Sequence, residues 1–455
     1  MIKQPERRQT PGTQSHQRWL VPWLLGLNLF LIYCLNGREV GGGDTVPATL
    51  LPLAIVRGDG PYLDRFASAI RDPLGRIPGY GTEVRGHAVS RYPLGPALVA
   101  LPFEWPQILL LDLVRPGWDA APAQAIEMAT FLGKNAAAAM AALTAVVLWF
   151  WLQRIGLGRV ALPVVLTASL GSDQWSTGSQ ALWQHGPAML CFSLALLALS
   201  LPNPGRLPMG LSGFFLAMMV ACRPIDLVFV VPLAGWVRWA FGRSRFLAFM
   251  LAGLLVALPL AFYNVWFFKT LTGGYAQIEQ MHPWAHGVRG TWTGNLGTGL
   301  LGTLLSPSHG LLVYCPWVLI AVFAIPQVLR LRGWKSLEGA LVLGLVANLG
   351  LLSKYSCWWA GHCFGPRFWI DATPILALLL AYGLDCRTGW TRFRLTLFWA
   401  SLLIAGSLQA VGFLCYPSTW HGQPTNSDLD HARLWDWGDT EVSRGLSEGI
   451  RPRNW

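Results

Sequence analysis

One carboxylate stands out for its position. Asp44 lies just beyond the first long apolar stretch, directly after the glycines at 41–43. Aspartate is a preferred helix N-cap, and Pro47 suits the first turn of a helix. A carboxylate at the boundary between water and membrane, beside glycines that let a ligand approach the backbone, could also act as a general base on a hydroxyl or amine. The two interpretations are compatible, and Asp44 is our candidate catalytic residue.

Basic residues follow Asp44 along the chain. The arginines of this segment are Arg57, Arg65, Arg71, Arg76, Arg85 and Arg91. Pairing with acidic neighbours on a solvated surface accounts for most of them, but a guanidinium can also hold a phosphate through two parallel hydrogen bonds. Arg91 is the best placed for this role, because Tyr92-Pro93 and an apolar segment follow it and would hold it at the depth of a lipid phosphate. We therefore take Arg91 as a candidate phosphate ligand and Tyr92 as a candidate substrate contact.

A third group of polar and aromatic residues lies at 354–371. Arg367 begins an apolar segment, and Asp371 follows one helical turn later on the same face. Charges just inside a membrane boundary are costly unless they are paired or functional. Two interpretations have equal weight: an Arg367–Asp371 pair that fixes the helix, and a donor-phosphate site at Arg367. Other residues of these loops that could contact a substrate are Lys354, Trp359, His362 and His309.

Metal-binding and redox patterns are weak. His282 and His286 have the spacing of one helix face, but Pro283 interrupts that helix, so no dedicated zinc site is predicted. Cys357 and Cys363 share one loop, which leaves a disulfide between them open. No Walker loop, dinucleotide fingerprint or nucleophile elbow is present, which argues against nucleotide-driven chemistry.

The composition is that of a membrane protein. Of the 455 residues, 53% are hydrophobic and 13% are charged, whereas a soluble domain carries about 25% charged residues. The net charge of +11 comes from short basic clusters between apolar blocks rather than from one patch, so a nucleic-acid partner is excluded. These clusters instead fit the bias of basic residues toward cytoplasmic loops.

The elements that must position the candidate residues are therefore membrane-spanning helices. We predict an all-α polytopic domain over residues 1–415 with about eleven spans and a cytoplasmic N-terminus. The first span covers about 19–36 and is not cleaved as a signal peptide; the second covers about 125–152. Between them lies a large extracytoplasmic loop, about 37–124. A short extracytoplasmic tail occupies 416–455.

Prolines interrupt the apolar parts of the first loop, around 46–56 and 94–111. Because their uninterrupted apolar runs are short, these stretches predict interfacial or re-entrant helices rather than spans. The weakest span lies at 208–240, because Arg223-Pro224-Ile225-Asp226 divides it.

This order of features resembles the GT-C superfamily of polytopic glycosyltransferases, which includes the protein O-mannosyltransferases and the lipid A aminoarabinose transferase. The motifs that carry the resemblance are short and cover most of the chain in order: Gly43-Asp44-Thr45, Arg91-Tyr92-Pro93-Leu94-Gly95, Ser306-Pro307-Ser308-His309-Gly310 and Gly365-Pro366-Arg367-Phe368.

The resemblance implies that Asp44 is the catalytic carboxylate and that Arg91 and Arg367 hold the phosphate of a polyprenyl-phosphate sugar donor. Many members carry a second acidic residue directly after the aspartate, where this chain has Thr45. No cofactor is therefore assigned, and a divalent cation stays open. Many members also end in a folded soluble domain, whereas this tail has about 40 residues.

The function expected on this basis is inverting sugar transfer to an acceptor at the extracytoplasmic face of a bacterial inner (plasma) membrane. Membrane lipids and the lipid-linked donor are the expected partners, and the sequence does not identify the acceptor. Two alternatives stay open: a transporter or flippase of an anionic lipid-linked sugar, and a non-catalytic membrane subunit of a polysaccharide-assembly complex. A transporter would need ionisable residues deep in several spans, and the sequence has few: Lys134, Arg223, Asp226 and Asp371.

Overall fold

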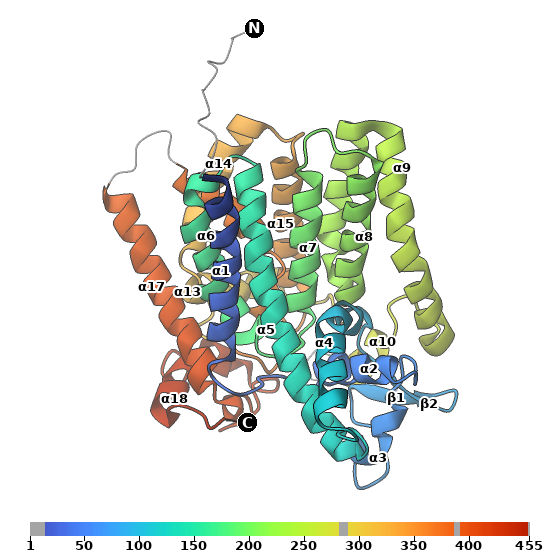
Figure 1. Cartoon of the computed structure of the whole chain (residues 1–455). Helices are drawn as coiled ribbons and strands as arrows, with labels where there is room; N and C mark the ends of the chain where they lie inside the picture. Colours follow the sequence, from blue (N-terminus) through green and yellow to red (C-terminus); the bar gives the residue numbers. More distant parts are fainter. Residues whose placement is uncertain (1–13, 282–289, 386–391, 454–455) are drawn as a thin grey trace.

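The protein is a bundle of helices with shorter elements gathered at one end. The computed structural model describes residues 14–281, 290–385 and 392–453. Helices make up 69% of it, and within the described ranges the only strands form one short hairpin, which confirms the all-α prediction. Figure 1 shows the shorter elements below the bundle. We call this the loop end, the end that carries residues 37–121 and 416–453.

Most helices of the bundle stand side by side (Figure 1). They are α1 (Gln14–Cys34), α5 (Pro122–Arg154), α6 (Ala161–Leu170), α7 (His185–Leu199), α8 (Arg206–Cys222), α9 (Leu227–Phe268), α14 (Val318–Arg332), α15 (Leu337–Lys354), α16 (Thr373–Leu384) and α17 (Arg392–Cys415). The remaining short elements of the bundle region are η2 (Gly158–Val160), η3 (Gln174–Gly178), η4 (Pro224–Asp226), α10 (Tyr275–Met281), α12 (Leu296–Leu305), α13 (Leu311–Tyr314) and η5 (Arg367–Trp369).

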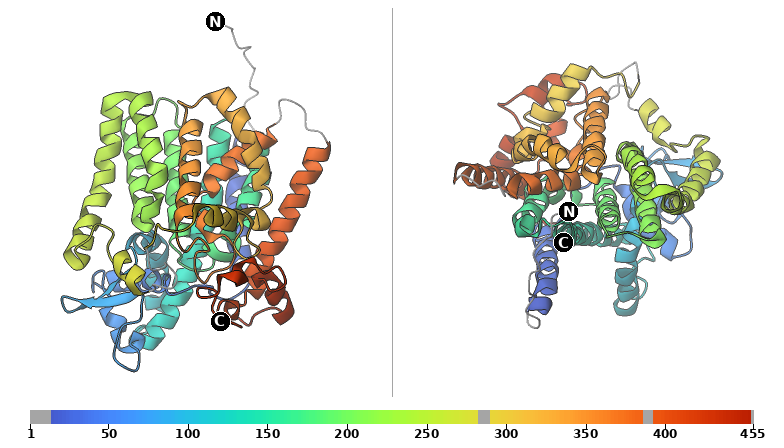
Figure 2. Two further views of the ribbon diagram at one scale, coloured as in Figure 1. Left: turned by 180° about the vertical axis from the view of Figure 1, so that it is seen from behind. Right: turned by 90° about the horizontal axis from the view of Figure 1, so that it is seen from above.

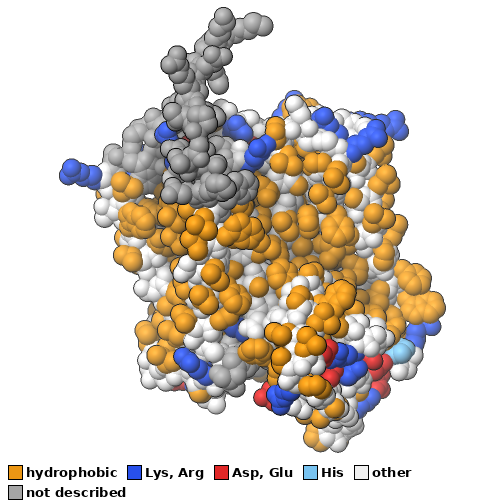
Figure 3. All heavy atoms as spheres, viewed as in Figure 1, with side chains coloured by type: hydrophobic (Ala, Val, Ile, Leu, Met, Phe, Trp, Pro, Cys, Tyr) orange, Lys and Arg blue, Asp and Glu red, His pale blue; other side chains and the backbone are white. Residues whose placement is uncertain are grey.

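Five described segments are long and apolar enough to cross a membrane. They are α4 (Gly95–Val114), α5, the segment 224–268, α15 and α17. The outward faces of the bundle stay apolar: Leu255, Phe323 and Leu403 are each at least 70% exposed. On the face seen in the space-filling view, apolar side chains form a broad band across the bundle (Figure 3). A surface of this kind needs lipid rather than water, which indicates a multi-pass membrane protein.

The segment 224–268 is two helices joined by a sharp reversal. Gly242 has φ 76°, in the left-handed region that glycine enters without steric cost. Leu227 and Leu260, on either side of Gly242, line the same cavity, so the chain must fold back between them. The break predicted at 223–226 is confirmed as η4, which separates α8 from α9.

Small residues and one buried lysine organise the centre of the bundle. Ala137 and Ala141 of α5 are 1% exposed, and such small side chains let neighbouring helices approach closely. Lys134, on the same helix, donates to the carbonyl oxygens of Tyr33 (2.8 Å) and Ser179 (3.0 Å) and to Gln180 Oε1 (2.6 Å). This lysine therefore ties α1 and the segment after η3 to α5.

The first loop folds as a small unit beside α5. It contains α2 (Val46–Val56), η1 (Asp64–Phe66), α3 (Ala67–Ile70), the antiparallel strands β1 (Gly81–Val84) and β2 (His87–Ser90), and α4. Strand pairing runs from Gly81 opposite Ser90 to Val84 opposite His87. Arg57 follows α2 and bonds to both Asp112 and Asp119 (Nε–Oδ2 2.7 Å), which fixes α2 against the end of α4.

The two helices predicted in this loop form as α2 and α4. α4, however, is one continuous 20-residue helix despite Pro102 and Pro106, and it has the length and composition of a span. The interruption expected at these prolines therefore does not occur, whereas the interfacial placement of α4 stays a prediction. A proline removes one helical hydrogen bond and kinks the helix, but packing against neighbouring helices can keep the helix going.

The C-terminal segment, residues 416–453, packs onto the loop end (Figure 2). Its elements are η6 (Ser418–His421), η7 (His431–Trp435) and α18 (Glu441–Glu448). The Ser306 hydroxyl donates to Leu434 O (2.6 Å), and Trp359 Nε1 donates to Asp428 Oδ1 (2.8 Å). The predicted tail is thus an ordered cap over two loops of the bundle.

Candidate functional site

The carboxylate of Asp44 meets the guanidinium of Arg367 at the loop end. Asp44 Oδ2 and Arg367 Nη1 are 3.0 Å apart, and their side chains are 17% and 12% exposed. Arg367 Nη2 donates to Ala360 O (2.8 Å), and its guanidinium lies over the Trp183 ring, 4.3 Å from the centroid. Burial lowers the pKa of Arg367, but the charge of Asp44 together with smaller contributions from Cys363 and Tyr92 raises it above its ordinary value. The buried Nε–H of Arg367 has no partner among the described residues.

A glycine turn brings Asp44 to this position. Thr45 N donates to Gly42 O (3.0 Å), and the Thr45 hydroxyl donates to the same oxygen (2.8 Å). A Cβ on Gly42 would lie 3.0 Å from the Trp183 ring, so glycine allows the ring that supports Arg367 to approach. The residue that caps α2 is Thr45, without a side-chain cap bond. The N-cap interpretation of Asp44 was therefore wrong.

The predicted pair between Arg367 and Asp371 does not form. Asp371 Oδ2 is instead 2.9 Å from His185 Nδ1 and also bonds to Arg223 Nη1. The prediction assumed one α-helix through 367–371, whereas η5 covers Arg367–Trp369 and α16 begins only at Thr373. Without helical spacing, the two side chains take different partners.

Behind the ion pair lies a second, fully buried set of charges. Arg223 is also 3.5 Å from Asp226, and its guanidinium lies over one side of the Phe368 ring at 4.8 Å. The Arg367 guanidinium lies 5.8 Å from the same ring. Phe368 therefore contacts both guanidinium groups. The sequence pointed to Arg223 and Asp226 as a break between helices and as rare ionisable residues within spans, but not to their contacts with Asp371 and Phe368.

Tyr92 lies near the candidate acid and both candidate phosphate ligands. Its ring meets that of Tyr275 edge to face, with centroids 6.2 Å apart, and Tyr275 donates to Gln184 Oε1 (2.6 Å). Burial raises the pKa of Tyr92, and so does the negative charge of Asp44. Arg367 and Arg91 act in the opposite direction. All three charges are thus close enough to Tyr92 to influence it.

Arg91 is held by neutral groups. Its Nε donates to Gln277 Oε1 (3.0 Å) and its Nη1 to Gly79 O (3.0 Å), and within the described ranges no carboxylate pairs with it. Burial lowers the pKa of Arg91. A Cβ on Gly274 would lie 2.5 Å from Arg91 Cα, so glycine is needed where these two loops cross. Arg91 is therefore a positioned cation that forms no ion pair with any side chain the structure describes.

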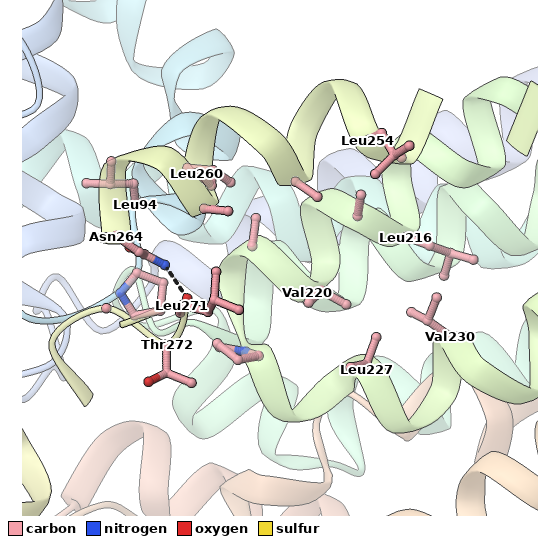
Figure 4. Close-up of a pocket in the computed structure, with 18 of the residues that line it drawn as sticks. Leu94, Leu216, Val220, Leu227, Val230, Leu254, Leu260, Asn264, Leu271 and Thr272 are labelled. Carbon is pink, nitrogen blue, oxygen red and sulfur yellow. Dashed lines mark hydrogen bonds between the residues drawn. The ribbon is translucent and has the colours of Figure 1, made fainter. Parts of the chain in front are cut away.

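An apolar groove runs from Arg91 into the bundle (Figure 4). It encloses about 340 Å³ between α8 and the two halves of α9. The residues labelled in the close-up are mostly aliphatic: Leu94, Leu216, Val220, Leu227, Val230, Leu254, Leu260, Asn264, Leu271 and Thr272. Asn264 Nδ2 donates to Leu271 O (2.8 Å) and shapes the mouth of the groove. The walls suit a hydrocarbon chain whose charged end is at Arg91.

A second, smaller cavity of about 270 Å³ lies on the other side of the glycine turn. Glu39, Gly41 and Thr45 line it together with α5 residues. Burial raises the pKa of Glu39 to about 7. The glycine run thus carries one acid on each flank, Glu39 before it and Asp44 after it.

The other predicted substrate contacts have different surroundings. Lys354 is exposed at the end of α15. Trp359 and His362 both contact Asp428 of the C-terminal segment, His362 Nε2 at 3.2 Å from Oδ2. His309 is buried and bonds through Nδ1 to Gly365 O (2.9 Å). None of these four shares a described hydrogen bond or ion pair with Asp44.

Several other site residues were not found from the sequence. Trp183, Gln184 and Tyr275 lie in the polar, aromatic loops at 172–185 and 269–310, which was the available signal. The thiols of Cys357 and Cys363 are both free. The pair His282 and His286 lies outside the described residues.

The chain matches no protein-family model and no curated protein sequence.

Proposed function

We propose that this protein is a membrane glycosyltransferase of the GT-C type, which moves a sugar from a polyprenyl-phosphate donor to an acceptor at the extracytoplasmic membrane face. The contact between Asp44 and Arg367, 323 residues apart in sequence, is the observation that carries the proposal. It joins the proposed base to a proposed phosphate-binding cation, and Tyr92, whose pKa both charges influence, lines the groove.

The orientation follows from helix direction. α5 begins at the loop end and finishes with Arg154, so this arginine lies at the opposite end. α14 finishes with Arg330 and Arg332, and α15 returns from there. Basic residues near helix ends favour the cytoplasm, which supports an extracytoplasmic loop end in this proposal. Counting α1, α5–α8, both halves of α9 and α14–α17, the chain would make about eleven passes.

The donor would bind with its prenyl chain in the groove and its phosphate at Arg91. The groove gives aliphatic walls to the chain, which water solvates poorly. The phosphate would give Arg91 an anionic partner, which the described side chains do not supply. Arg367, whose Nε–H has no partner among the described residues, is close enough to Tyr92 to influence its pKa and would complete the phosphate site.

In the reaction, Asp44 would accept a proton from the acceptor hydroxyl or amine as its oxygen or nitrogen attacks the anomeric carbon. The bond between that carbon and the phosphate oxygen breaks, and its electron pair stays on the lipid phosphate. Arg91 and Arg367 would stabilise the charge that builds up there. Attack opposite the leaving phosphate inverts the anomeric configuration.

Donor binding would also release the base. In the free protein Arg367 is paired with Asp44. A phosphate that competes for the guanidinium would loosen this pair and leave the Asp44 carboxylate available for the acceptor.

A flippase or carrier for an anionic lipid-linked sugar is the second candidate, because the same arginines could line a passage. It needs ionisable groups along the path. The buried Lys134 is fully bonded to three oxygens, which fits a structural role better than a moving ligand. A non-catalytic subunit of a polysaccharide-assembly complex is the third.

In the deciding experiment, the purified protein is placed in vesicles. Labelled polyprenyl-phosphate sugars and crude membrane acceptors are then added. A transferase moves label into a new product and a carrier moves it only across the bilayer, whereas a subunit does neither. Asp44→Asn should abolish transfer, and Asp64→Asn, which changes an exposed acid paired with His87, should not. Normal turnover by a folded Asp44→Asn variant would rule out the base role.

A further inference from the structure

Three buried side chains that the proposed function does not use converge beneath the C-terminal segment. His309 comes from the loop between α12 and α13, His421 from the end of η6, and Glu441 from the start of α18. One ligand atom from each lies within 4.8 Å of those from the other two. All three side chains are at most 2% exposed.

The hydrogen bond of His309 fixes which of its nitrogens is free. Nδ1 lies 2.9 Å from Gly365 O, and a carbonyl oxygen can only accept, so Nδ1 carries the proton. Nε2 then presents a lone pair, yet it is buried without a partner among the described residues. Metal-bound histidines are typically held in this way, with the other ring nitrogen donating to a carbonyl or carboxylate.

His421 and Glu441 also have unused capacity. His421 Nε2 lies 3.0 Å from Glu441 Oε1, but Oε1 has no aligned hydrogen bond, and neither does His421 Nδ1. The other carboxylate oxygen, Oε2, accepts from Gly365 N (3.0 Å). Leaving buried polar groups unpaired is costly. A cation among these atoms would remove that cost.

We propose that His309, His421 and Glu441 bind a divalent transition-metal ion, with zinc the best match to two imidazoles and one carboxylate. Burial lowers the pKa values of His309 and His421, so both rings are neutral, the form that binds metal. No thiolate takes part in this ligand set.

The ion would hold the C-terminal segment against the loop that carries Arg367. Gly365 accepts from His309 and donates to Glu441, and it stands two residues before Arg367. Gly365 has φ 61°, a conformation that glycine tolerates best. Metal binding would therefore fix both the C-terminal segment and the loop that places Arg367.

The alternative is a hydrogen-bond network without metal. The Tyr416 hydroxyl lies 2.7 Å from His421 Nε2, and Tyr314 Oη lies 3.5 Å from Glu441 Oε2. These contacts give a partner to one atom of His421 and one atom of Glu441, but they leave His309 Nε2 without a partner among the described residues. Metal content distinguishes the two arrangements directly.

The test uses the full-length chain, purified through a tag without histidines, loaded with zinc, dialysed and analysed for bound metal. We expect near-stoichiometric zinc in the parent. His309→Ala and Glu441→Gln should each weaken zinc binding by at least the ~10–100-fold that loss of an outer-shell partner costs. His87→Ala removes an exposed histidine that is distant in sequence from all three proposed ligands, and this variant should keep the metal.

Cobalt gives a readout that needs no variant. The parent protein loaded with Co²⁺ should show visible bands of a low-symmetry nitrogen and oxygen site, without a thiolate charge-transfer band. Failure of the parent to retain zinc or to develop cobalt bands would overturn the proposal and leave the hydrogen-bond network. Equal zinc in folded His309→Ala and parent would do the same. Neither readout depends on sugar transfer.

Discussion

Asp44 and Arg367 form an ion pair at 3.0 Å that joins the first loop to the segment before α16. The pair is only partly shielded, and the Trp183 ring supports it from one side. Arg367 would serve two partners in turn, the Asp44 carboxylate in the free protein and a phosphate in the complex. Its planar fork of donors suits both.

The first prediction concerns the geometry of this guanidinium. Arg367→Lys keeps the charge but loses the fork, so we expect kcat to fall by about 100-fold or more, as when one preorganised donor to a developing charge is removed. Labelled-donor turnover measures this effect. Arg65→Lys, at an ion pair with Asp59 elsewhere in the loop, is the matched control. An unchanged kcat in Arg367→Lys would remove Arg367 from the reaction.

The second prediction tests the groove as the prenyl site. Ala257 lines the groove, whereas its neighbour Leu258 does not line it and is 62% exposed. Ala257→Trp should fill the groove and raise KM for a long-chain donor by about tenfold or more, the effect of about 1.4 kcal/mol of lost binding. Leu258→Trp should leave KM unchanged. Donors with a short prenyl chain should be affected less, and equal effects on both chain lengths would contradict this site for the lipid.

The third prediction concerns the charges behind the site. Asp371→Leu leaves the buried Arg223 with only Asp226 at 3.5 Å. Breaking a buried ion pair in this way costs about 3–5 kcal/mol. Unfolding in mixed detergent should show a loss of this order, with Asp72→Leu in the exposed part of the first loop as control. Adding Arg223→Met and Asp226→Asn to Asp371→Leu should recover stability, because no buried charge of this set is then left unpaired; no recovery would mean that the loss in Asp371→Leu does not come from an unpaired Arg223.

The fold class and the candidate residues could be predicted from the sequence, whereas the contacts of these residues could not. Long apolar blocks predict membrane helices directly, because the hydrocarbon layer sets their length. Asp44, Arg91 and Arg367 could be chosen because charged groups are rare beside such blocks. Their partners could not be predicted: helical spacing suggested Asp371 for Arg367, but the chain there forms a short 3-10 turn.

Contacts between distant segments were also beyond sequence reasoning. His309, His421 and Glu441 meet only because the C-terminal segment folds back over the bundle. No local spacing links them, whereas His282 and His286, which do have the spacing of one helix face, lie outside the described residues. Continuous α4 shows the opposite limit: prolines in a sequence predict a break, but packing decides whether the helix ends.

The fourth prediction concerns pH and Glu39. Burial raises the pKa of Glu39 from its ordinary value of 4.5 to about 7. Between these two values the folded protein holds a proton that the unfolded chain has released, so stability falls as pH rises from about 4.5 to about 7 and then levels off. Glu39→Gln should remove this part of the pH dependence. The stability of the variant, compared with that of the parent at the same pH, should therefore be higher at pH 8 than at pH 4.5.

Thermal unfolding of the parent and of Glu39→Gln across this pH range measures the effect. Glu83→Gln is the control, because Glu83 is exposed on β1 and paired with Arg71. Since Glu39 lines the cavity beside the glycine turn, the same titration would change the charge next to Asp44 and an acceptor. Parallel pH profiles for the parent and Glu39→Gln would show that Glu39 titrates at its ordinary value, and that Asp44 works beside a permanently charged neighbour.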